Sequence, residues 1–443
     1  MNAAAKIHLV SLGCPKNTVD SERMLGLLDG NGYQTTSDPH AADVVIVNTC
    51  GFIGPAKEES IDAILAAHEL RETGVCKGVI VTGCLAERYR PELRRELAEE
   101  ADEILTLGQE KEIARCVDRL LGRARERYID SAPRLQTTPR HWAYLRISDG
   151  CDHQCAFCAI PLIKGRHRSE PVEALVAEAQ RLTAAGVREL VLVSQDSVRY
   201  GKDLYGRFEL LPLLRRLAAV EGLEWMRLMY TYPAFWSDDL IDFFAASPVM
   251  CNYIDMPLQH ISDQVLARMK RATTRRKTLE LLEKLRTRLP GVGLRSSFIV
   301  GFPGETDAQF EELLEFIEAS RFDNATCFIY STEEGTAAAD LDQPVAEEVK
   351  EERYRRLTEL QDRISAEINL GLVGTRQTVL IDEREGETGG GFRGRMQRDA
   401  PEIDGSVAVA AGEAELRPGS FAEVEITGAY PYELTARALG PVW

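Results

Sequence analysis

The sequence predicts an α/β multidomain protein with an N-terminal parallel α/β sheet domain, a central partial (β/α)6 barrel and a C-terminal small antiparallel β-barrel. Three observations support this fold class. Residues 1–130 alternate apolar strand-like runs with helical stretches, residues 137–370 contain six strand–helix units, and residues 375–443 contain short strand-like runs between glycine-rich turns. A chain of 443 residues, 44% of them hydrophobic, is also too long for one core.

Three apolar runs of the N-terminal domain each lead to a cysteine. "KIHLVSLG" precedes Cys14, "ADVVIVNTC" ends at Cys50 and "KGVIVTGC" ends at Cys84. Helical stretches such as "DSERMLGLLDG" and "KEESIDAILAAHEL" follow, so the strands should be parallel. Because ligands bind at the carboxyl ends of parallel strands, we expect these three cysteines on one rim. Four other cysteines share no such position and are interpreted as buried structural thiols: Cys76, Cys116, Cys251 and Cys327.

The central domain should be an open version of the (β/α)8 barrel. Amphipathic stretches such as "PVEALVAEAQRLTAAG" and "RKTLELLEKLRTRL" separate most of its strands. The loops at the carboxyl ends of barrel strands ordinarily carry the chemistry, so these loops hold the candidate site. The strands are expected at Trp142–Ser148, Glu189–Gln195, Trp225–Pro233, Tyr253–Gln259, Leu294–Gly301 and Ala325–Ser331.

The loop after the first barrel strand reads "DGCDHQCAFCAIP" and places Cys151, Cys155 and Cys158 in a Cys-x3-Cys-x2-Cys spacing. Structural zinc requires four ligands, usually in two separate pairs, and no fourth cysteine completes the set. A [4Fe–4S] cluster held by three thiolates leaves one iron open to bind a substrate or cofactor. The spacing therefore favours an iron–sulfur cluster over zinc.

This motif, with the aromatic Phe157 before its last cysteine, resembles the signature of the radical S-adenosylmethionine (SAM) superfamily. The resemblance implies a cluster that Phe157 shields and that binds SAM. The turn "GFPGETD" is similar to the SAM-contacting turn of that superfamily, and Gln195 and Asp196 lie where it handles the SAM amino group or the substrate. The residues of the turn that the resemblance assigns to SAM are Gly301, Pro303, Gly304, Glu305 and Thr306.

A three-cysteine α/β domain before such a barrel resembles the methylthiotransferase family, which replaces a C–H bond with C–SCH3. "SLGCPKNTVDSE" (Ser11–Glu22) resembles the branch that modifies an aspartate of small-subunit ribosomal protein S-twelve, whereas the transfer-RNA branch typically carries Gly-Cys-Gln-Met-Asn. The resemblance implies SAM as radical source and methyl donor, and an electron donor such as flavodoxin or ferredoxin. It also implies two [4Fe–4S] clusters, one on Cys14, Cys50 and Cys84 and one on Cys151, Cys155 and Cys158. No side chain is assigned as a catalytic acid or base.

The C-terminal segment begins with a predicted long helix at Glu351–Gly374, followed by the strand-like runs "RQTVLIDE", "GSVAVAAG" and "SFAEVEITGA". It resembles the TRAM domain, which often binds RNA. From residue 375 to 443 the chain has 7 arginines, no lysine and 12 acidic residues, a net charge of −5. Arg393, Arg395 and Arg398 form a local cluster and are, with Asp196, candidate substrate contacts.

The whole chain carries a formal net charge of −17, which disfavours broad binding to nucleic acid and suits a basic protein partner. Transfer RNA is therefore an unlikely partner. No apolar run approaches the ~20 residues of a membrane span. The start "MNAAAKIHLVSLG" lacks a signal-peptide core, so we expect a cytoplasmic protein. Two rivals remain: transfer-RNA methylthiolation by the same machinery, and a non-catalytic iron–sulfur protein that binds RNA or senses redox state.

Overall fold

The N-terminal domain is a five-stranded parallel sheet in the order β2-β1-β3-β4-β5. The computed structural model describes residues 4–386, 391–412 and 414–441. The strands are β1 (Lys6–Ser11), β2 (Gln34–Thr35), β3 (Val44–Thr49), β4 (Val79–Gly83) and β5 (Glu103–Ile104). The helices are α1 (Pro15–Gly30), α2 (Gly54–Thr73), α3 (Cys84–Arg88), α4 (Arg90–Glu96) and α5 (Ile113–Leu120). One apolar cluster packs α1 and α5 on one face, and another packs α2, α3 and α4 on the other.

The central domain is the predicted open barrel of six parallel strands. They form two three-stranded sheets, β6-β9-β10 and β11-β12-β13, and an isolated parallel bridge joins Met226 of β10 to Met250, which precedes β11. The main strands are β6 (Trp142–Arg146), β9 (Glu189–Val193), β10 (Trp225–Leu228), β11 (Tyr253–Asp255), β12 (Gly293–Val300) and β13 (Asn324–Ile329). A small hairpin joins β7 (Ser148–Asp149) to β8 (Arg168–Ser169).

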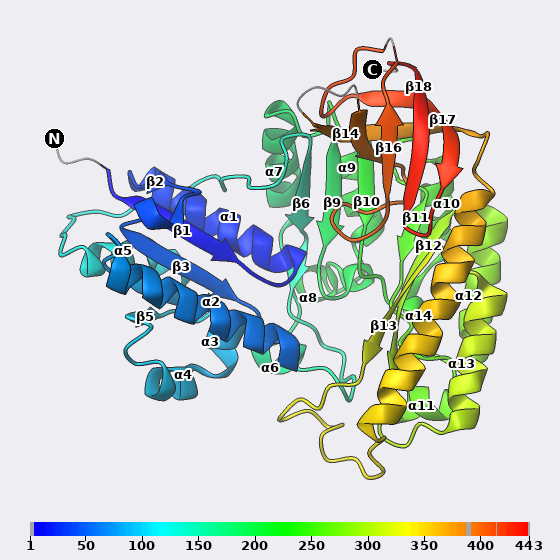
Figure 1. The fold of residues 1–443 in the computed structure, drawn as a ribbon, viewed down its shortest axis with the longest axis horizontal. Coiled ribbons are helices and arrows are strands. Elements are labelled where there is room, and N and C mark those ends of the chain that lie inside the picture. Colours follow the sequence, from blue (N-terminus) through cyan, green and yellow to red (C-terminus); the bar gives the residue numbers. More distant parts are fainter. Residues whose placement is uncertain (1–3, 387–390, 413, 442–443) are drawn as a thin grey trace.

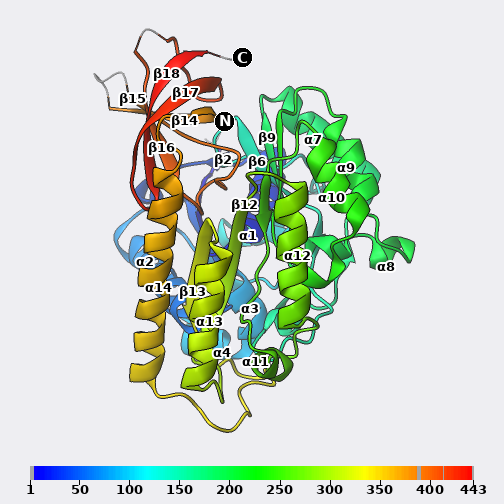
Figure 2. The same ribbon diagram turned by 90° about the vertical axis from the view of Figure 1, so that its right-hand side faces the viewer.

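Helices cover the outside of this barrel, as the side view in Figure 2 shows for α12, α13 and α14. The longer ones are α7 (Val172–Ala184), α9 (Leu210–Ala218), α10 (Asp238–Ala246), α12 (Arg275–Arg288), α13 (Asp307–Ser320) and α14 (Glu347–Leu370). The short ones are α6 (Ile160–Ile163), α8 (Lys202–Tyr205) and α11 (Asp263–Arg268). The final helix lies about four residues earlier than the sequence predicts.

Two barrel strands end earlier than predicted, for a reason that the backbone makes plain. We expected β10 to reach Pro233 and β11 to reach Gln259, but they end at Leu228 and Asp255. Tyr230 has φ 58° and Gln259 has φ 74°, in the left-handed region that an extended strand cannot include. The chain therefore turns at the carboxyl end of the barrel instead of continuing the ladder.

The C-terminal domain is a closed five-stranded barrel in the order β14-β15-β16-β18-β17, which confirms the predicted small β-barrel. The strands are β14 (Arg376–Glu385), β15 (Gly391–Arg395), β16 (Ser406–Ala410), β17 (Phe421–Ala429) and β18 (Glu433–Pro441). The sequence did not predict β15 or β18. The β16–β18 pairing is parallel, whereas the other pairings are antiparallel.

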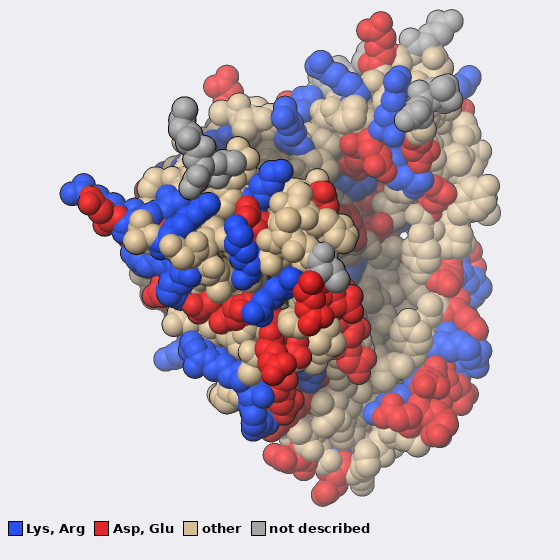
Figure 3. Space-filling view, turned by 60° about the vertical axis from the view of Figure 1, so that its left-hand side comes forward, with Lys and Arg blue, Asp and Glu red and all other residues tan. Residues whose placement is uncertain are grey.

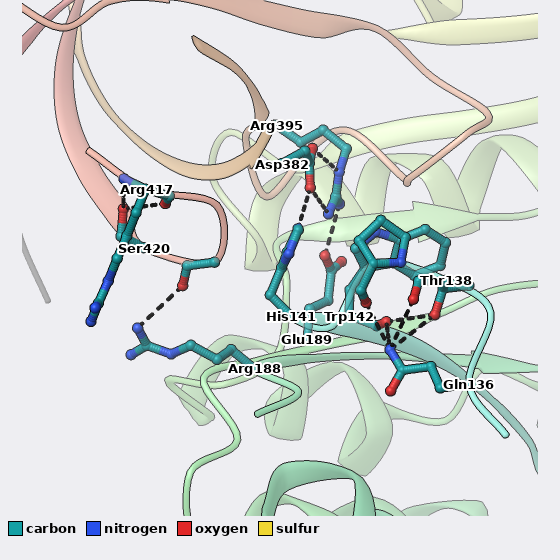
Figure 4. Close-up of polar contacts among 12 residues, drawn as sticks. Gln136, Thr138, His141, Trp142, Arg188, Glu189, Asp382, Arg395, Arg417 and Ser420 are labelled. Atoms are coloured by element: carbon teal, nitrogen blue, oxygen red, sulfur yellow. Dashed lines mark hydrogen bonds and ion pairs between the residues drawn. The ribbon is translucent and has the colours of Figure 1, made fainter. Parts of the chain in front are cut away.

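This small barrel closes the amino-terminal end of the central barrel (Figure 1). Trp142 and Trp225, which begin β6 and β10, share a buried cluster with Leu380 and Phe421 of the C-terminal domain, and Val19 of α1 joins the same cluster. Figure 4 shows the polar part of the seam. Because one end of the barrel is closed, chemistry is restricted to the opposite end, where the cysteine loop lies.

A cavity of about 420 Å³ lies beside this seam and is lined by Arg140, Arg188 and Arg417 among others. Arg188 also donates to the Gly419 carbonyl oxygen, as the close-up shows. The cavity is thus separated from the cysteine loop by the length of the central barrel. Among the described residues, no helix combines the length and the apolar character needed to cross a bilayer.

Candidate cluster and SAM site

The three N-terminal cysteines follow β1, β3 and β4, which are neighbours in the sheet, so they share one rim as predicted. Cys14 is the N-cap of α1, and Cys84 is the first residue of α3. Gly13 has φ 90°, and a Cβ atom there would lie 3.0 Å from the Cys50 Sγ atom. The Cys84 thiol lies 3.7 Å from Asn17 Oδ1, on the first turn of α1. All three thiols therefore surround the start of α1.

Burial affects the protonation of two of these cysteines, Cys50 and Cys84. Burial raises the pKa of Cys50 and of Cys84, and the charges of the neighbouring thiols raise both values further. A thiol with a raised pKa becomes a thiolate only when a positive centre stabilises it. Loading a metal group here would therefore release protons.

The second set lies in the loop that joins β7 to α6. Cys151 donates its amide to the Gly165 carbonyl oxygen at 3.1 Å, and Cys158 donates its amide to the Cys155 carbonyl oxygen at 3.1 Å. Burial raises the pKa of Cys151 to about 11 and that of Cys158 to about 12. The Arg271 guanidinium lies 3.7 Å from Cys155 Sγ, so one cation faces the set.

Aromatic contacts hold this loop against the barrel. His153, between the first two cysteines, stacks on Tyr232 with 4.1 Å between ring centroids and 13° between ring planes. The Arg271 guanidinium also contacts this ring, with its Cζ atom 4.2 Å from the centroid of Tyr232. Tyr232 therefore anchors both the cysteine loop and the cation beside it.

Each set brings three cysteines together, one on a rim of the N-terminal sheet and the other around one loop of the barrel. In the described part of the chain, no three His, Cys, Asp or Glu side chains meet closely enough to hold one metal ion. In a [4Fe–4S] cluster each thiolate binds a different iron, so its ligands surround the cluster and do not converge on a point. Three cysteines on one rim, or around one loop, match that requirement.

The two cysteine sets lie on facing surfaces of two domains. Cys84 packs with Ala159 and Ile163, and Ala159 directly follows Cys158. The strands of the N-terminal sheet point their carboxyl ends at the barrel (Figure 1), and Figure 3 shows a deep hollow between the two domains. A group held by either set would therefore border the same interdomain space.

A buried charge network fastens this interface. Asp20 of α1 pairs with Arg146 of β6, and its other oxygen accepts from Lys164 Nζ at 3.0 Å. Asp149 lies 3.5 Å from the same Lys164 Nζ. Burial raises the pKa of the nearby Glu110 to about 8, and the charge of Asp20 adds to that shift. The network fixes α1, and hence Cys14, relative to the cysteine loop of the barrel.

The structure brings the "GFPGETD" turn close to the cysteine loop. Phe157 packs in one apolar cluster with Phe302 of the turn, where Ala156 and Tyr330 are also buried. The two glycines of the turn have positive φ, and Cβ atoms on them would collide with side chains at 2.3 Å, from Lys350 at Gly301 and from Arg268 at Gly304. The absence of a side chain at Gly301 and Gly304 therefore lets Lys350 and Arg268 pack directly against the backbone of the turn.

Other predicted SAM contacts in this turn have partners within the protein. Glu305 is buried, accepts from the Phe302 amide and pairs with Arg353 at 3.2 Å. Burial raises the pKa of Glu305 to about 7 although the Arg353 charge opposes that shift. Thr306 caps α13 in a capping box with Gln309, and Pro303 is buried. These contacts shape the turn whether or not SAM is bound.

Gln195 and Asp196 lie beside the cysteine loop. Asp196 is buried and accepts from His153 Nε2 at 2.6 Å. Gln195 donates its side-chain amide to Asp149 at 3.0 Å, and its buried Oε1 atom has no hydrogen-bond partner among the described residues. A buried acceptor without a donor is costly, so Gln195 suits a ligand that brings an N–H group, such as the amino group of SAM.

Arg393, Arg395 and Arg398 were predicted as candidate substrate contacts, and the burial of Arg395 corrects that expectation for this residue. Arg395 is 4% exposed and pairs with Glu189 at the start of β9 and with Asp382, as Figure 4 shows. Arg398 pairs with Asp323 at 2.8 Å. Arg393 is half-buried between Glu385 and Glu433. These guanidiniums are neutralised by carboxylates, a pairing that local sequence does not reveal.

Sequence patterns of known families match each part of the chain. The pattern of the uncharacterized protein family UPF0004 matches residues 6–106, that of the radical SAM superfamily matches residues 145–317, and that of the TRAM domain matches residues 373–439. A ribosomal protein uS12 methylthiotransferase RimO from Trichlorobacter lovleyi is 46% identical over 446 residues, which cover 99% of both chains. The chain belongs to the RimO family. The predicted resemblance is thus confirmed.

A second RimO protein, from Desulforamulus reducens, is also 46% identical and covers 97% of this chain and 98% of its own. As a RimO-family member with a radical SAM domain, the protein is a radical-SAM methylthiotransferase that uses an iron–sulfur cluster and SAM. Among solved structures, the radical SAM methyltransferase TsrM from Kitasatospora setae has a TM-score of 0.54 at 15% identity and covers 85% of this chain and 80% of its own. That likeness concerns the fold alone.

Proposed function

We propose that this RimO-family chain methylthiolates the β-carbon of an aspartate in ribosomal protein uS12, with two [4Fe–4S] clusters and with SAM as both radical source and methyl donor. The carrying observation is that Cys84 packs against Ala159, next to Cys158, so that the two cysteine sets border one interdomain space. Two groups that act in turn on one carbon atom must both reach it, and this arrangement allows that.

The proposed ligands are the six cysteines described above, three to a cluster. We assign the SAM amino group to Gln195 because its Oε1 atom is buried without a partner among the described residues. Phe157 would cover the barrel cluster, and the backbone of the Gly301–Thr306 turn would border SAM. Asp196 is proposed to act through His153, which holds the loop, and not by direct contact with the substrate. We propose that the N-terminal domain comprises residues 1–130, the radical SAM domain residues 137–370 and the C-terminal barrel residues 375–443.

When bound, the barrel cluster and SAM supply a carbon radical strong enough to remove an unactivated hydrogen atom, and the second cluster and a further SAM supply sulfur and methyl. The protein's own contribution is to position the cysteine loop and to enclose the reacting groups. Tyr232 and Arg271 fix the cysteine loop, and Phe157 with Phe302 keeps water from its inner side. The C-terminal barrel closes the far end, so the substrate enters through the hollow in Figure 3.

Charge favours the ribosomal protein over transfer RNA as the partner. The chain carries a net charge of −17, and Figure 3 shows acidic side chains along both sides of the hollow. Such a surface attracts a basic protein and repels phosphates. We propose a flavodoxin or ferredoxin as electron donor. We place the reaction in the cytoplasm, because cluster cysteines must remain reduced until iron is loaded.

Two triple variants test this assignment in anaerobically reconstituted protein. Replacing Cys151, Cys155 and Cys158 with alanine should abolish SAM cleavage. Replacing Cys14, Cys50 and Cys84 should leave formation of 5′-deoxyadenosine but abolish methylthiolation of uS12, followed by mass spectrometry. Cys76→Ala, a buried cysteine outside both sets, is the control and should retain both activities. Eight irons per chain in either triple variant would refute the ligand assignment.

A further inference from the structure

Lys16 is a buried cation without a carboxylate partner. It is 8% exposed, and among the described residues its ammonium forms no ion pair with Asp or Glu. Its Nζ atom lies 3.4 Å from the centroid of the Tyr230 ring. The other buried lysines and arginines of the described chain each pair with a carboxylate: Arg146, Lys164, Arg227, Lys350, Arg353 and Arg395.

Besides Tyr230, the groups whose charges act on Lys16 are the Cys14 thiol and Asp255, and the Asp255 carboxylate already has two partners. Asp255 interacts with Lys16, but one of its oxygens pairs with Arg295 at 2.8 Å and the other accepts from the Tyr230 amide at 2.8 Å. Tyr230 itself has φ 58°, an unfavourable conformation for an aromatic residue, and such strain collects at functional sites. The strained residue Tyr230 thus places its aromatic ring against the Lys16 ammonium.

A second series of contacts between the two cysteine sets runs through Lys16. It is two residues after Cys14, and it contacts Tyr230, which is two residues before Tyr232. Tyr232 stacks on His153, which lies between Cys151 and Cys155. Lys16 is therefore close in the structure to both cysteine sets.

A buried ammonium without a carboxylate partner is costly, and a carboxylate that arrives beside it lowers that cost. The target of the proposed reaction is an aspartate, which brings a carboxylate to the reacting carbon. We propose that Lys16 binds the side-chain carboxylate of the target aspartate and thereby selects aspartate over a neutral side chain. The assignment rests on the proposed function. The aromatic ring of Tyr230 keeps the ammonium in place without competing for the carboxylate.

The test measures binding and does not depend on turnover. Anaerobically reconstituted protein without reductant is titrated with uS12 and with uS12 that carries asparagine at the target position. Lys16→Met keeps the length and apolar contacts of the side chain, Lys16→Arg keeps the charge, and Lys6→Met removes an exposed lysine of the same domain as a control. Iron content is measured for every variant.

The native protein should bind the aspartate form roughly 10- to 100-fold more tightly than the asparagine form, the value of a charged hydrogen bond. Lys16→Met should lose that preference by weakening the aspartate form alone, Lys16→Arg should keep most of it, and Lys6→Met should keep all of it. Equal weakening of both forms, or none, would overturn the proposal. So would a fall in iron content for Lys16→Met, because Lys16 would then be a counter-ion of the cluster.

Failure of the proposed function gives a different result. If the native protein does not methylthiolate uS12 at all, the function is wrong and the aspartate preference is absent from every protein in the series. If the native protein methylthiolates uS12 and prefers aspartate while Lys16→Met does so equally, only the role of Lys16 is wrong.

Discussion

At the scale of single residues, the geometry of the N-terminal cysteine set depends on glycines. Gly83 has φ 93°, and a Cβ atom there would lie 2.4 Å from both Asn48 Oδ1 and the Thr49 carbonyl oxygen. Gly83 has ψ −162°, and this combination of φ and ψ is adopted essentially by glycine alone, so Gly83→Ala adds a collision to a backbone cost of roughly 1–3 kcal/mol. We expect it to lower unfolding stability by more than about 2 kcal/mol and to reduce iron loading, because Cys84 is the next residue. Denaturant unfolding and iron content measure both effects.

Gly32→Ala is the matched control for this substitution. Gly32 also has positive φ, at 78°, but a Cβ atom there would meet nothing within 4 Å. Gly32→Ala should lower unfolding stability only through the cost of positive φ in the backbone, and it should leave iron loading unchanged. An equal loss of stability in both variants would mean that the packing around Gly83 relaxes and does not constrain Cys84.

The positions of the six proposed cysteine ligands could be predicted from sequence, because a cysteine at the end of a strand or a close cysteine spacing in one loop is a local feature of the chain. The side chains that surround these cysteines could not be predicted from sequence. Lys16 appears within the motif "SLGCPKNTVDSE", but its lack of a counter-ion depends on Tyr230, more than 200 residues away. Arg395 fails for the same reason, since its carboxylate partner Glu189 is remote in sequence. Ionic pairing across domains leaves no periodic signal.

At the scale of elements, the sequence predicts strands that are long and apolar and misses those that are short or exposed. All six strands of the central barrel were predicted because most of their residues are buried, as in β9 and β10. In contrast, β2 and β5 have two residues each, and β15 contains two glycines. A two-residue strand has no measurable alternation, and glycine has low strand propensity.

One loop acts as a clamp between domains. Glu333, which follows β13, accepts from Lys57 of α2 at 2.9 Å and from Arg88 of α3 at 2.7 Å. Burial alone raises the pKa of Glu333, but hydrogen bonds from Lys57, Arg88 and Ser331 outweigh it, so the pKa lies below its ordinary value. We expect Glu333→Gln to weaken the clamp and to raise hydrogen exchange at the start of α2.

The sign of the pH dependence follows from the lowered pKa. A carboxyl group with a depressed folded-state pKa contributes stability above its unfolded pKa of 4.5, and this contribution is lost as pH falls through the folded value. Protection of α2 in the native protein should therefore fall in acid, and this part of the dependence should be absent from Glu333→Gln. Glu96→Gln, which breaks an exposed ion pair with Arg95, should behave as the native protein does.

At the scale of the whole molecule, ion pairs join the C-terminal barrel to the central one. Arg395 is buried between Glu189 and Asp382, and Asp382 also accepts from His141 at 2.8 Å. Arg395→Met leaves two carboxylates with one cation fewer, which costs on the order of 3–5 kcal/mol. Thermal unfolding should show a lower midpoint or a separate early transition of the C-terminal domain.

Arg393→Met controls for the loss of an arginine from the same strand. Arg393 is two residues earlier in β15 and half-exposed, and its carboxylate partners Glu385 and Glu433 also face solvent. It should cost under about 1 kcal/mol. If both variants unfolded alike, the seam would be held by its apolar cluster and not by the buried ion pairs.

The charge of the whole protein governs its choice of partner. In the C-terminal domain, Arg393, Arg395 and Arg398 are paired with carboxylates and so do not offer free charge to phosphates. The chain carries a net charge of −17. We therefore expect the full-length protein to bind uS12 more tightly than transfer RNA in side-by-side titrations at equal ionic strength. Salt should weaken the uS12 complex, because screening reduces attraction between opposite charges. Salt dependence alone does not separate the partners, since phosphate binding also weakens with salt. Tighter binding of transfer RNA would contradict the charge argument, and because neither cysteine set depends on it, the cluster assignments would stand.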